Sequence, residues 1–196
     1  MSDSHDVTRR EMLGWLALAP LASPFAAAES AQRALEQAVA TGVPYSAKFF
    51  TAHEWRTVRI LVDDIIPRDE RSGSATDAGV PEFMDFMMID RPAGQLPMRG
   101  GLHWLDVNSK QRFGAAYADC SHAQRTALLD DIAFPARAHP AMSHGVAFFT
   151  MFRNLTASGF WSSRMGVADL RYMGNTVVHE WEGCPPAALA KLGVSY

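Results

Sequence analysis

The side chains that could perform catalysis or bind a metal are few and widely spaced in this sequence. Among the histidines, His139 and His144 are five positions apart, whereas two zinc ligands on one helix face usually stand about four apart. Two acidic pairs, Asp63-Asp64 and Asp69-Glu70, surround the end of a predicted helix, where neighbouring acids usually form a solvated edge. We therefore predict surface or core histidines, and no catalytic, cofactor-binding or metal-binding residue in this chain. The seven histidines are His5, His53, His103, His122, His139, His144 and His179.

The motifs of the common cofactor and hydrolase classes are missing from the printed sequence. No Gly-x-Gly pair is present, which excludes the usual Rossmann dinucleotide fingerprint. The sequence has no Cys-x-x-Cys-His for covalent haem and no Gly-x-Ser-x-Gly nucleophile elbow, and its two cysteines cannot hold a four-cysteine iron–sulfur cluster. The net charge of −3, with no basic block beyond one arginine pair, argues against a nucleic-acid partner.

The first 28 residues have the pattern of a twin-arginine signal peptide. Arg9 and Arg10 form the arginine pair, an apolar run follows from 13 to 25, and Ala26-Ala27-Ala28 offers a cleavage site. The apolar run is shorter than the ~20 residues that span a bilayer. The alternative is an uncleaved amphipathic helix or membrane anchor. We expect residues 1–28 to be removed from a periplasmic protein that crosses the membrane folded, through the twin-arginine translocon.

The two cysteines, Cys120 and Cys184, allow two interpretations. An exported protein meets an oxidising compartment, so a disulfide between them is permitted. The alternative is a pair of separate buried thiols. The sequence leaves both open, because it does not show whether the two residues approach within bonding distance.

The elements that would position any site are predicted to be helices. Thr51 and Glu54 have the spacing of a capping box, and Pro67 ends the helix that follows. A polar loop, 68–77, precedes a second helix that restarts at Gly79-Val80-Pro81-Glu82. Further helices are predicted over 29–40, after Gly101, from a second capping box at Ser121 and Gln124, and over 140–156, with Gly159 as the C-terminal glycine.

These elements define the fold class, because no persuasive alternating strand and no internal repeat is found. We predict an all-α protein, a small helical bundle built around one core in residues 29–196. Residues 160–196 form its irregular tail, rich in glycine and aromatic residues, with a short terminal helix over 185–192. The tail is too aromatic to be disordered. It therefore either wraps its own bundle or docks on a partner.

Several aromatic residues are candidates for an interface with another protein. Phe148 and Phe149, with Met151 and Phe152, cover more than one face of the predicted helix over 140–156, and such a helix is buried on several sides. Aromatic anchors are also the residue types that carry interface energy. The alternative is that they pack within the chain. The interface candidates are Phe148, Phe149, Trp161, Tyr172 and Trp181.

Three segments resemble the gluconate 2-dehydrogenase subunit 3 family. They are DDIIPRDE at 63–70, AGVPEFMD at 78–85 and RMGVADLRYMGNTVVHEWEGCP at 164–185. The resemblance extends over roughly 49–193, and the twin-arginine leader fits the same family. One departure is the loop sequence at 72–75, Ser-Gly-Ser-Ala, where many members have a proline-glycine-alanine run.

The resemblance implies a non-catalytic small, or gamma, subunit of a periplasmic FAD-dependent dehydrogenase acting on gluconate, sugars or glycosides. A large subunit of the glucose-methanol-choline type would hold the FAD, and a cytochrome c subunit with haem c would accept the electrons. The small subunit would stabilise the large one as a chaperone and carry the export signal for both. The alternative is an independent periplasmic enzyme or small-ligand binding protein that uses the histidines or acids such as Asp63, Asp64 and Asp69.

Overall fold

The structure is a computed structural model that describes residues 24–41, 45–172, 174, 180 and 183–195. Arg9, Arg10 and Trp181 lie outside the described residues. Within those ranges all regular secondary structure is helical, with loops between the helices, and no strand is found. This confirms the predicted all-α class. The α-helices are α2 (Pro24–Thr41), α3 (Ala52–Ile65), α4 (Val80–Asp90), α5 (Gln95–Phe113), α6 (His122–Ala133), α7 (Ser143–Ser162), α8 (Arg164–Asp169) and α9 (Pro186–Leu192). The short 3-10 helices are η1 (Pro92–Gly94), η2 (Tyr117–Asp119) and η3 (Pro140–Met142).

Both predicted capping boxes are present at helix starts. At α3 the Thr51 hydroxyl accepts a bond from the backbone N–H of Glu54 at 3.3 Å, and the Glu54 carboxylate accepts from the Thr51 N–H at 2.8 Å. Ser121 and Gln124 make the same reciprocal bonds at α6. Each box pairs two backbone donors that the helix itself leaves unsatisfied, so both helix starts are set by local sequence.

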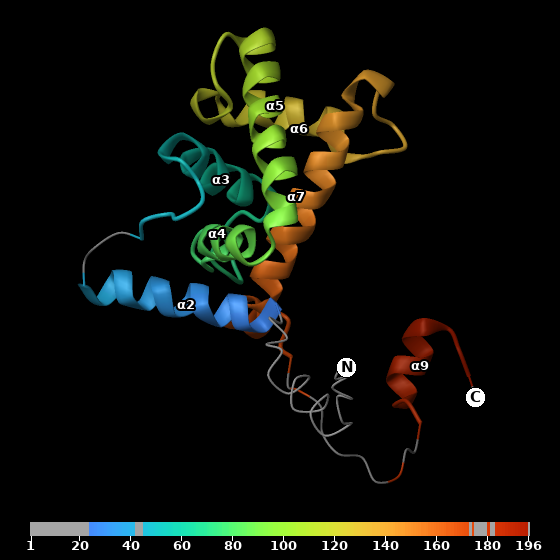
Figure 1. Ribbon diagram of the computed structural model, residues 1–196. Coiled ribbons are helices and arrows are strands. Elements are labelled where there is room, and N and C mark those ends of the chain that lie inside the picture. The colour runs from blue at the N-terminus through green and yellow to red at the C-terminus, as the bar shows by residue number, and fades with distance from the viewer. Residues whose placement is uncertain (1–23, 42–44, 173, 175–179, 181–182, 196) are drawn as a thin grey trace, which may run out of the picture.

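The long helices α5 and α7 lie side by side through the middle of the bundle (Figure 1). Helices α3 and α4 pack on one side of this pair, α6 contacts both members of the pair, and α2 crosses over α4 and the end of α7. Large apolar side chains from these helices meet in one core. Its fully buried members include Val58 and Leu61 of α3, Phe83 and Met84 of α4, Met98 and Leu105 of α5, and Phe152 and Phe160 of α7.

Two predicted helix boundaries are wrong, and glycines used for packing are the reason. Helix α5 begins at Gln95 and runs through Gly100 and Gly101, where the prediction started it after Gly101. Helix α7 continues to Ser162, past the predicted end at Gly159, and α8 follows almost at once. A Cβ at Gly159 would lie 2.7 Å from the Phe83 ring. This glycine therefore allows a close approach of α4 to α7 instead of ending a helix.

Gly101 is the point of closest contact between α5 and α7, and its neighbour Gly100 provides a matched control. A Cβ on Gly101 would lie 1.8 Å from Cδ2 of the buried Phe148 ring, whereas a Cβ on Gly100 would meet nothing within 4 Å. We expect Gly101→Ala to lower the free energy of unfolding by about 2 kcal/mol or more, because the two helices must separate. Gly100→Ala should raise it by up to about 1 kcal/mol, since alanine is the better helix former.

Chemical denaturation of the two variants beside the parent chain measures both values. Equal effects at the two positions would show that α5 and α7 do not meet as described.

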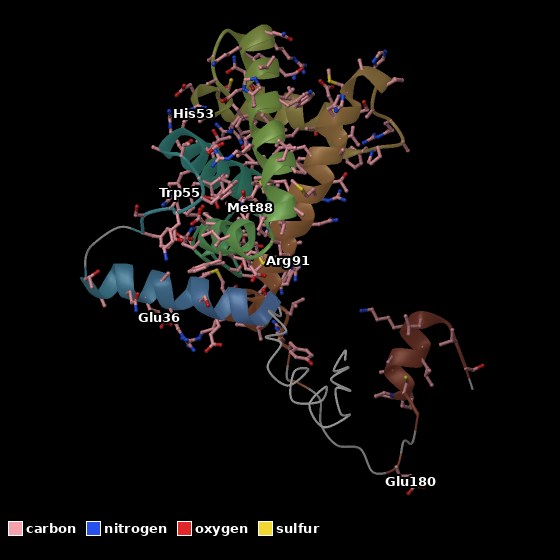
Figure 2. The ribbon with its side chains drawn as sticks, viewed as in Figure 1. Glu36, His53, Trp55, Met88, Arg91 and Glu180 are labelled. Atoms are coloured by element: carbon pink, nitrogen blue, oxygen red, sulfur yellow. The ribbon has the colours of Figure 1, made fainter. Side chains whose placement is uncertain are left out.

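The C-terminal helix α9 confirms the predicted terminal helix but contributes no buried residue. Leu192 and Val194, at its end, are 71% and 55% exposed. Figure 1 shows α9 apart from the other helices, and Figure 2 shows Glu180, between α8 and α9, away from the bundle as well. Whether the tail wraps its own bundle or docks on a partner stays a prediction.

Candidate functional site

Asp63 and Asp64, in the segment 63–70 that carries the family resemblance, bond to other parts of the fold. Asp64 was predicted to lie on a solvated edge, but its side chain is only 7% exposed. Its carboxylate accepts bonds from Nε of Arg125 at 2.7 Å, Nη2 of Arg125 at 3.0 Å and the Tyr117 hydroxyl at 2.9 Å. The neighbouring Asp63 accepts a bond from the backbone N–H of Thr76 at 2.7 Å. The two carboxylates therefore serve different contacts and do not form an acid–base pair.

Tyr117 lies between two acids and is fully buried. Its hydroxyl donates to Asp64, and its backbone N–H donates to Asp106 of α5 at 3.0 Å. His53, which Figure 2 labels at the start of α3, bonds to the same Asp106. Burial and the nearby Asp64 charge hold the pKa of Tyr117 far above its usual value, so the hydroxyl remains a donor. The segment that contains η2 is thereby fastened to α3 and α5.

The motif loop between α3 and α4 is held by its own polar residues. Asp69 accepts the backbone N–H groups of Arg71 and Ser72, both at 2.8 Å, and these two bonds lower the pKa of the Asp69 carboxyl. The Arg71 guanidinium reaches Asp169 at the end of α8 at 2.7 Å. At the start of α4, Gly79 has a φ of 80°, in the left-handed region that favours glycine. These contacts bring the loop against α8, where the tail begins.

Asp85 organises the segment that enters α3. Its buried carboxylate accepts four hydrogen bonds: from the Tyr45 hydroxyl at 2.9 Å and from the backbone N–H groups of Lys48, Phe49 and Phe50 at 2.8 to 3.1 Å. Burial first, and then the bond to Asp85, raise the pKa of Tyr45 above its usual value. The Asp85 carboxylate thus accepts hydrogen bonds from three consecutive backbone N–H groups, and it anchors the segment before α3 to α4.

Glu82, one turn before Asp85, is buried without such a partner. It is 3% exposed, and its Oε2 has no hydrogen-bond partner among the described residues. Burial raises the pKa of its carboxyl, a hydrogen bond from its own backbone N–H and then Arg59 of α3 oppose the rise, and the nearby Asp85 adds to it. The protonated form of Glu82 is therefore more favoured in the folded chain than in the unfolded one.

We expect Glu82→Gln to make the free energy of unfolding less dependent on pH. Because the folded pKa of Glu82 is raised, its contribution to stability is complete below its unfolded pKa, near 4.5, and is lost as the pH rises through the folded value. Glutamine cannot ionise, so the variant should be more stable than the parent at pH 7 and similar to it at pH 4. Urea denaturation at the two pH values measures this difference, and a variant that is less stable at pH 7 would contradict it.

The histidines and cysteines do not assemble a reactive centre within the described residues. No group of three or more His, Cys, Asp or Glu side chains there is placed to hold a metal ion. Cys120 is buried, and its Sγ lies 3.8 Å from the carbonyl oxygen of Ala115, whereas Cys184 is half-buried. The disulfide between the two cysteines stays a prediction.

The predicted interface aromatics divide into two groups. Phe148 and Phe149 are 5% and 7% exposed and belong to the chain's own core, because α5 and α6 cover α7 on those faces. For these two candidates the structure has the alternative that the sequence left open, packing within the chain. Trp161 and Tyr172 are 39% and 60% exposed, and Leu170 between them is 56% exposed. Exposed apolar side chains thus gather along the chain where the tail leaves α7 and α8.

Three hollows mark the surface of the described residues. One, of about 720 Å³, lies between α2 and the segment from Tyr45 to Lys48, and includes the cations Arg33 and Lys48. Another, of about 610 Å³, lies at the connection from α6 to α7 and is lined by Asp130, Asp131, Phe134, Arg137, His139 and Met142. A third, of about 370 Å³, lies between α5 and α7.

Comparison with known families gives one match, and it spans most of the bundle. The family model for gluconate 2-dehydrogenase subunit 3 matches residues 52–180. The chain belongs to the gluconate 2-dehydrogenase subunit 3 family. The match begins with α3 and ends beyond α8, so α2 and α9 lie outside it. No curated protein and no solved structure matches the chain.

The family match confirms the resemblance that the motifs indicated. In this member of the subunit 3 family, the motif acids Asp64, Asp69 and Asp85 act as acceptors that fasten loops and helices. Within the described ranges no helix combines the length and the apolar composition needed to cross a membrane. The exposed apolar residues Trp161, Leu170 and Tyr172 are the main candidate functional feature of the chain.

Proposed function

We propose that this chain is the small, non-catalytic subunit of an exported dehydrogenase complex acting on gluconate, a sugar or a glycoside. A catalytic subunit of the glucose-methanol-choline type would hold FAD, and a cytochrome c subunit would accept the electrons through haem c. The chain would hold no cofactor itself. It would stabilise the catalytic subunit as a chaperone and carry it by the twin-arginine route to the periplasm, where the complex would lie at the membrane.

The observation that carries this proposal is the family match over 52–180, because the family is described as a subunit of a dehydrogenase. The roles of the motif acids are consistent with it, since these acids bond to other parts of the fold and leave no acid–base pair in a hollow. The arginine pair at Arg9 and Arg10 supports the export step. Together these observations favour an escort over an enzyme.

The exposed apolar residues near the tail support a permanent partner. Trp161, Leu170 and Tyr172 would lose unfavourable contact with water if a second protein covered them. Large aromatic side chains of this kind contribute most of the binding energy in many interfaces. Interfaces of permanent complexes commonly bury on the order of 2,000 Å² or more, so such a partner would cover far more of the chain than these three side chains.

Co-expression with a flavin-dependent dehydrogenase subunit of the same organism tests the proposal. We expect a tag on this chain to recover the second protein, with flavin absorption and dehydrogenase activity in the same fraction. The catalytic protein expressed without this chain should be unstable or remain in the cytoplasm. Recovery of this chain as a monomer that is active by itself, with no flavoprotein attached, would favour the independent enzyme instead.

A further inference from the structure

The turn that ends α8 has an arginine at a position whose backbone conformation favours glycine. Arg171 has a φ of 53°, and among the described residues it is the only residue other than glycine with a φ in the left-handed region. In that region a Cβ crowds the following carbonyl oxygen, so glycine adopts it far more easily than arginine does. Residues held in such conformations gather at functional sites, which makes Arg171 a candidate.

Helix α9 ends in the same kind of turn and has glycine at the equivalent position. After α8, the N–H of Tyr172 donates to the Val167 carbonyl oxygen at 3.2 Å, which is the long bond of a Schellman turn. After α9, the N–H of Val194 donates to the Leu189 carbonyl oxygen at the same distance, and Gly193 occupies the left-handed position. The two turns share this bond and differ in the residue, so the turn itself does not require an arginine.

The guanidinium of Arg171 is exposed and has no acid beside it in the described part of the chain. The other two arginines at α8 are each paired. Arg71 meets Asp169 at 2.7 Å, and Arg164 meets Glu36 at 2.8 Å. The nearby acid Asp169 is thus already engaged, and the positive charge of Arg171 remains available to another molecule.

Exposed apolar side chains accompany this arginine. Leu170 and Tyr172 flank it in the sequence, and both are more than half exposed. A Cβ on Gly166 would lie 2.0 Å from the Phe160 carbonyl oxygen, so α8 packs tightly against the end of α7. Because the six residues of α8 span only about 9 Å, the exposed Trp161 and the residues after α8 lie at the same end of the molecule.

We propose that Arg171 binds an aspartate or glutamate side chain of the catalytic subunit, an inference that rests on the proposed function. Leu170, Tyr172 and Trp161 would form the apolar contact around this ion pair. Charge complementarity identifies the group, because a guanidinium covered without a counter-charge loses its hydration unpaired, whereas a carboxylate fits its fork with two hydrogen bonds. Arginine, tyrosine and tryptophan are also the residue types that contribute most of the binding energy at interface centres.

An anionic membrane surface is the other occupant that tryptophan, tyrosine and arginine could suit. Recognition of anionic lipid by a protein surface usually needs a cluster of roughly four to eight basic residues. Here Arg71 and Arg164 are paired with acids, and the net charge of the chain is −3. One unpaired arginine among apolar side chains therefore fits a single carboxylate of a protein partner better than a lipid surface.

Two substitutions at Arg171 separate binding from stability. Arg171→Gly installs the residue type that ends α9, and Arg171→Asn removes the charge with a side chain that tolerates the left-handed conformation. We expect complexes of both variants to lose the catalytic subunit at least about tenfold faster than the parent complex, because its carboxylate is left without a counter-charge. Each variant chain alone should unfold at a temperature equal to or above that of the parent. A merely structural role of Arg171 would instead lower both properties together.

Arg137→Asn is the matched control. Arg137 is exposed at the other end of α7, where its guanidinium packs on the Phe134 ring, and its replacement removes the same charge from the chain. Each chain is co-expressed with the catalytic subunit, the complex is captured through a tag on this chain, and the release of flavoprotein is followed at low and at high salt. The control should release it at the parent rate. Salt should speed release from the parent more than from Arg171→Asn, since it screens an ion pair that the variant lacks.

The outcomes separate this inference from the proposed function. A parent chain that captures no flavoprotein overturns the proposed function, and the role of Arg171 falls with it. Equal release from the parent and both Arg171 variants overturns the role of Arg171 alone, and so does equally fast release from the Arg137→Asn control or an equal effect of salt on parent and variant. Two further outcomes overturn it because they show a different occupant: a dimer of this chain that Arg171→Asn converts to monomers, and vesicles of phosphatidylcholine and phosphatidylglycerol that bind the parent but not Arg171→Asn.

Discussion

Replacing Arg9 and Arg10 together by lysine should leave both this chain and its catalytic subunit in the cytoplasm. Lysine preserves the positive charge of the leader but not the planar guanidinium groups, so the change tests recognition of the arginine pair and not its charge alone. If this chain carries the only export signal of the complex, periplasmic dehydrogenase activity should fall to the level of cells that lack this chain. Activity assays and immunoblots of the periplasmic and cytoplasmic fractions measure the loss.

The cytoplasmic fraction provides the control for this experiment. The variant complex should still form there and should oxidise substrate after cell lysis, because the leader lies outside the matched region at 52–180. An unrelated substrate of the twin-arginine route should be exported normally in the same cells. Normal periplasmic activity of the lysine variant would count against escort by this chain, whatever the fate of the leader itself.

The sequence predicted those helix starts that depend on neighbouring residues. The box of Thr51 with Glu54, and that of Ser121 with Gln124, need only residues three apart, so local sequence contains all the information. Gly101 and Gly159 were misjudged because a glycine has two common uses. Only the position of Phe148 or Phe83 on another helix decides between a helix boundary and a close contact, and sequence spacing does not give that position.

The candidate site was predictable in outline and not in detail. The motifs identified the family, and the surplus of aromatic residues indicated a contact surface. Helix periodicity could not tell which aromatic side chains face the chain's own core, and so Phe148 and Phe149 were assigned to an interface. The hollow between α5 and α7 has no sequence signal of its own, because it arises where the rings of Phe148 and Trp104 each lie against a glycine of the other helix.

The same limit applies to the buried acids. Asp64 falls opposite the apolar stripe of α3, and from that position a solvated carboxylate is the reasonable prediction. A helix can nevertheless be covered on a second side. Here Tyr117 and Arg125, which are more than 50 positions later in the sequence, cover the polar face of α3 and bond to Asp64 there. The sequence could have indicated the burial of Asp64 only by pairing this acid with one arginine on another predicted helix. Many acid–arginine pairs in the sequence meet that condition, so it does not single out Arg125.

Removing the arginine of this pair should be among the most destabilising single changes in the bundle. The side chains of Arg125 and Asp64 are 16% and 7% exposed and meet through two hydrogen bonds, and Arg125 also donates to the Cys120 carbonyl at 2.7 Å. The bond to Asp64 raises the pKa of Arg125, so the guanidinium stays charged across the accessible pH range. We expect Arg125→Met to lower the free energy of unfolding by about 3 kcal/mol, because it leaves a buried carboxylate without its counter-charge.

An exposed pair with the same chemistry shows why burial decides this result. Arg112 of α5 meets Asp131 of α6 at 2.6 Å, but both side chains are 45% exposed, so Arg112→Met should cost less than about 1 kcal/mol. Combining Arg125→Met with Asp64→Asn should recover most of the loss, since the amide oxygen can still accept from Tyr117 and no charge remains. Urea denaturation of the three variants compares these values. Similar costs for the two single arginine variants would mean that water reaches Asp64, and the pair of Asp64 with Arg125 would then not hold α3 to α6 as the geometry requires.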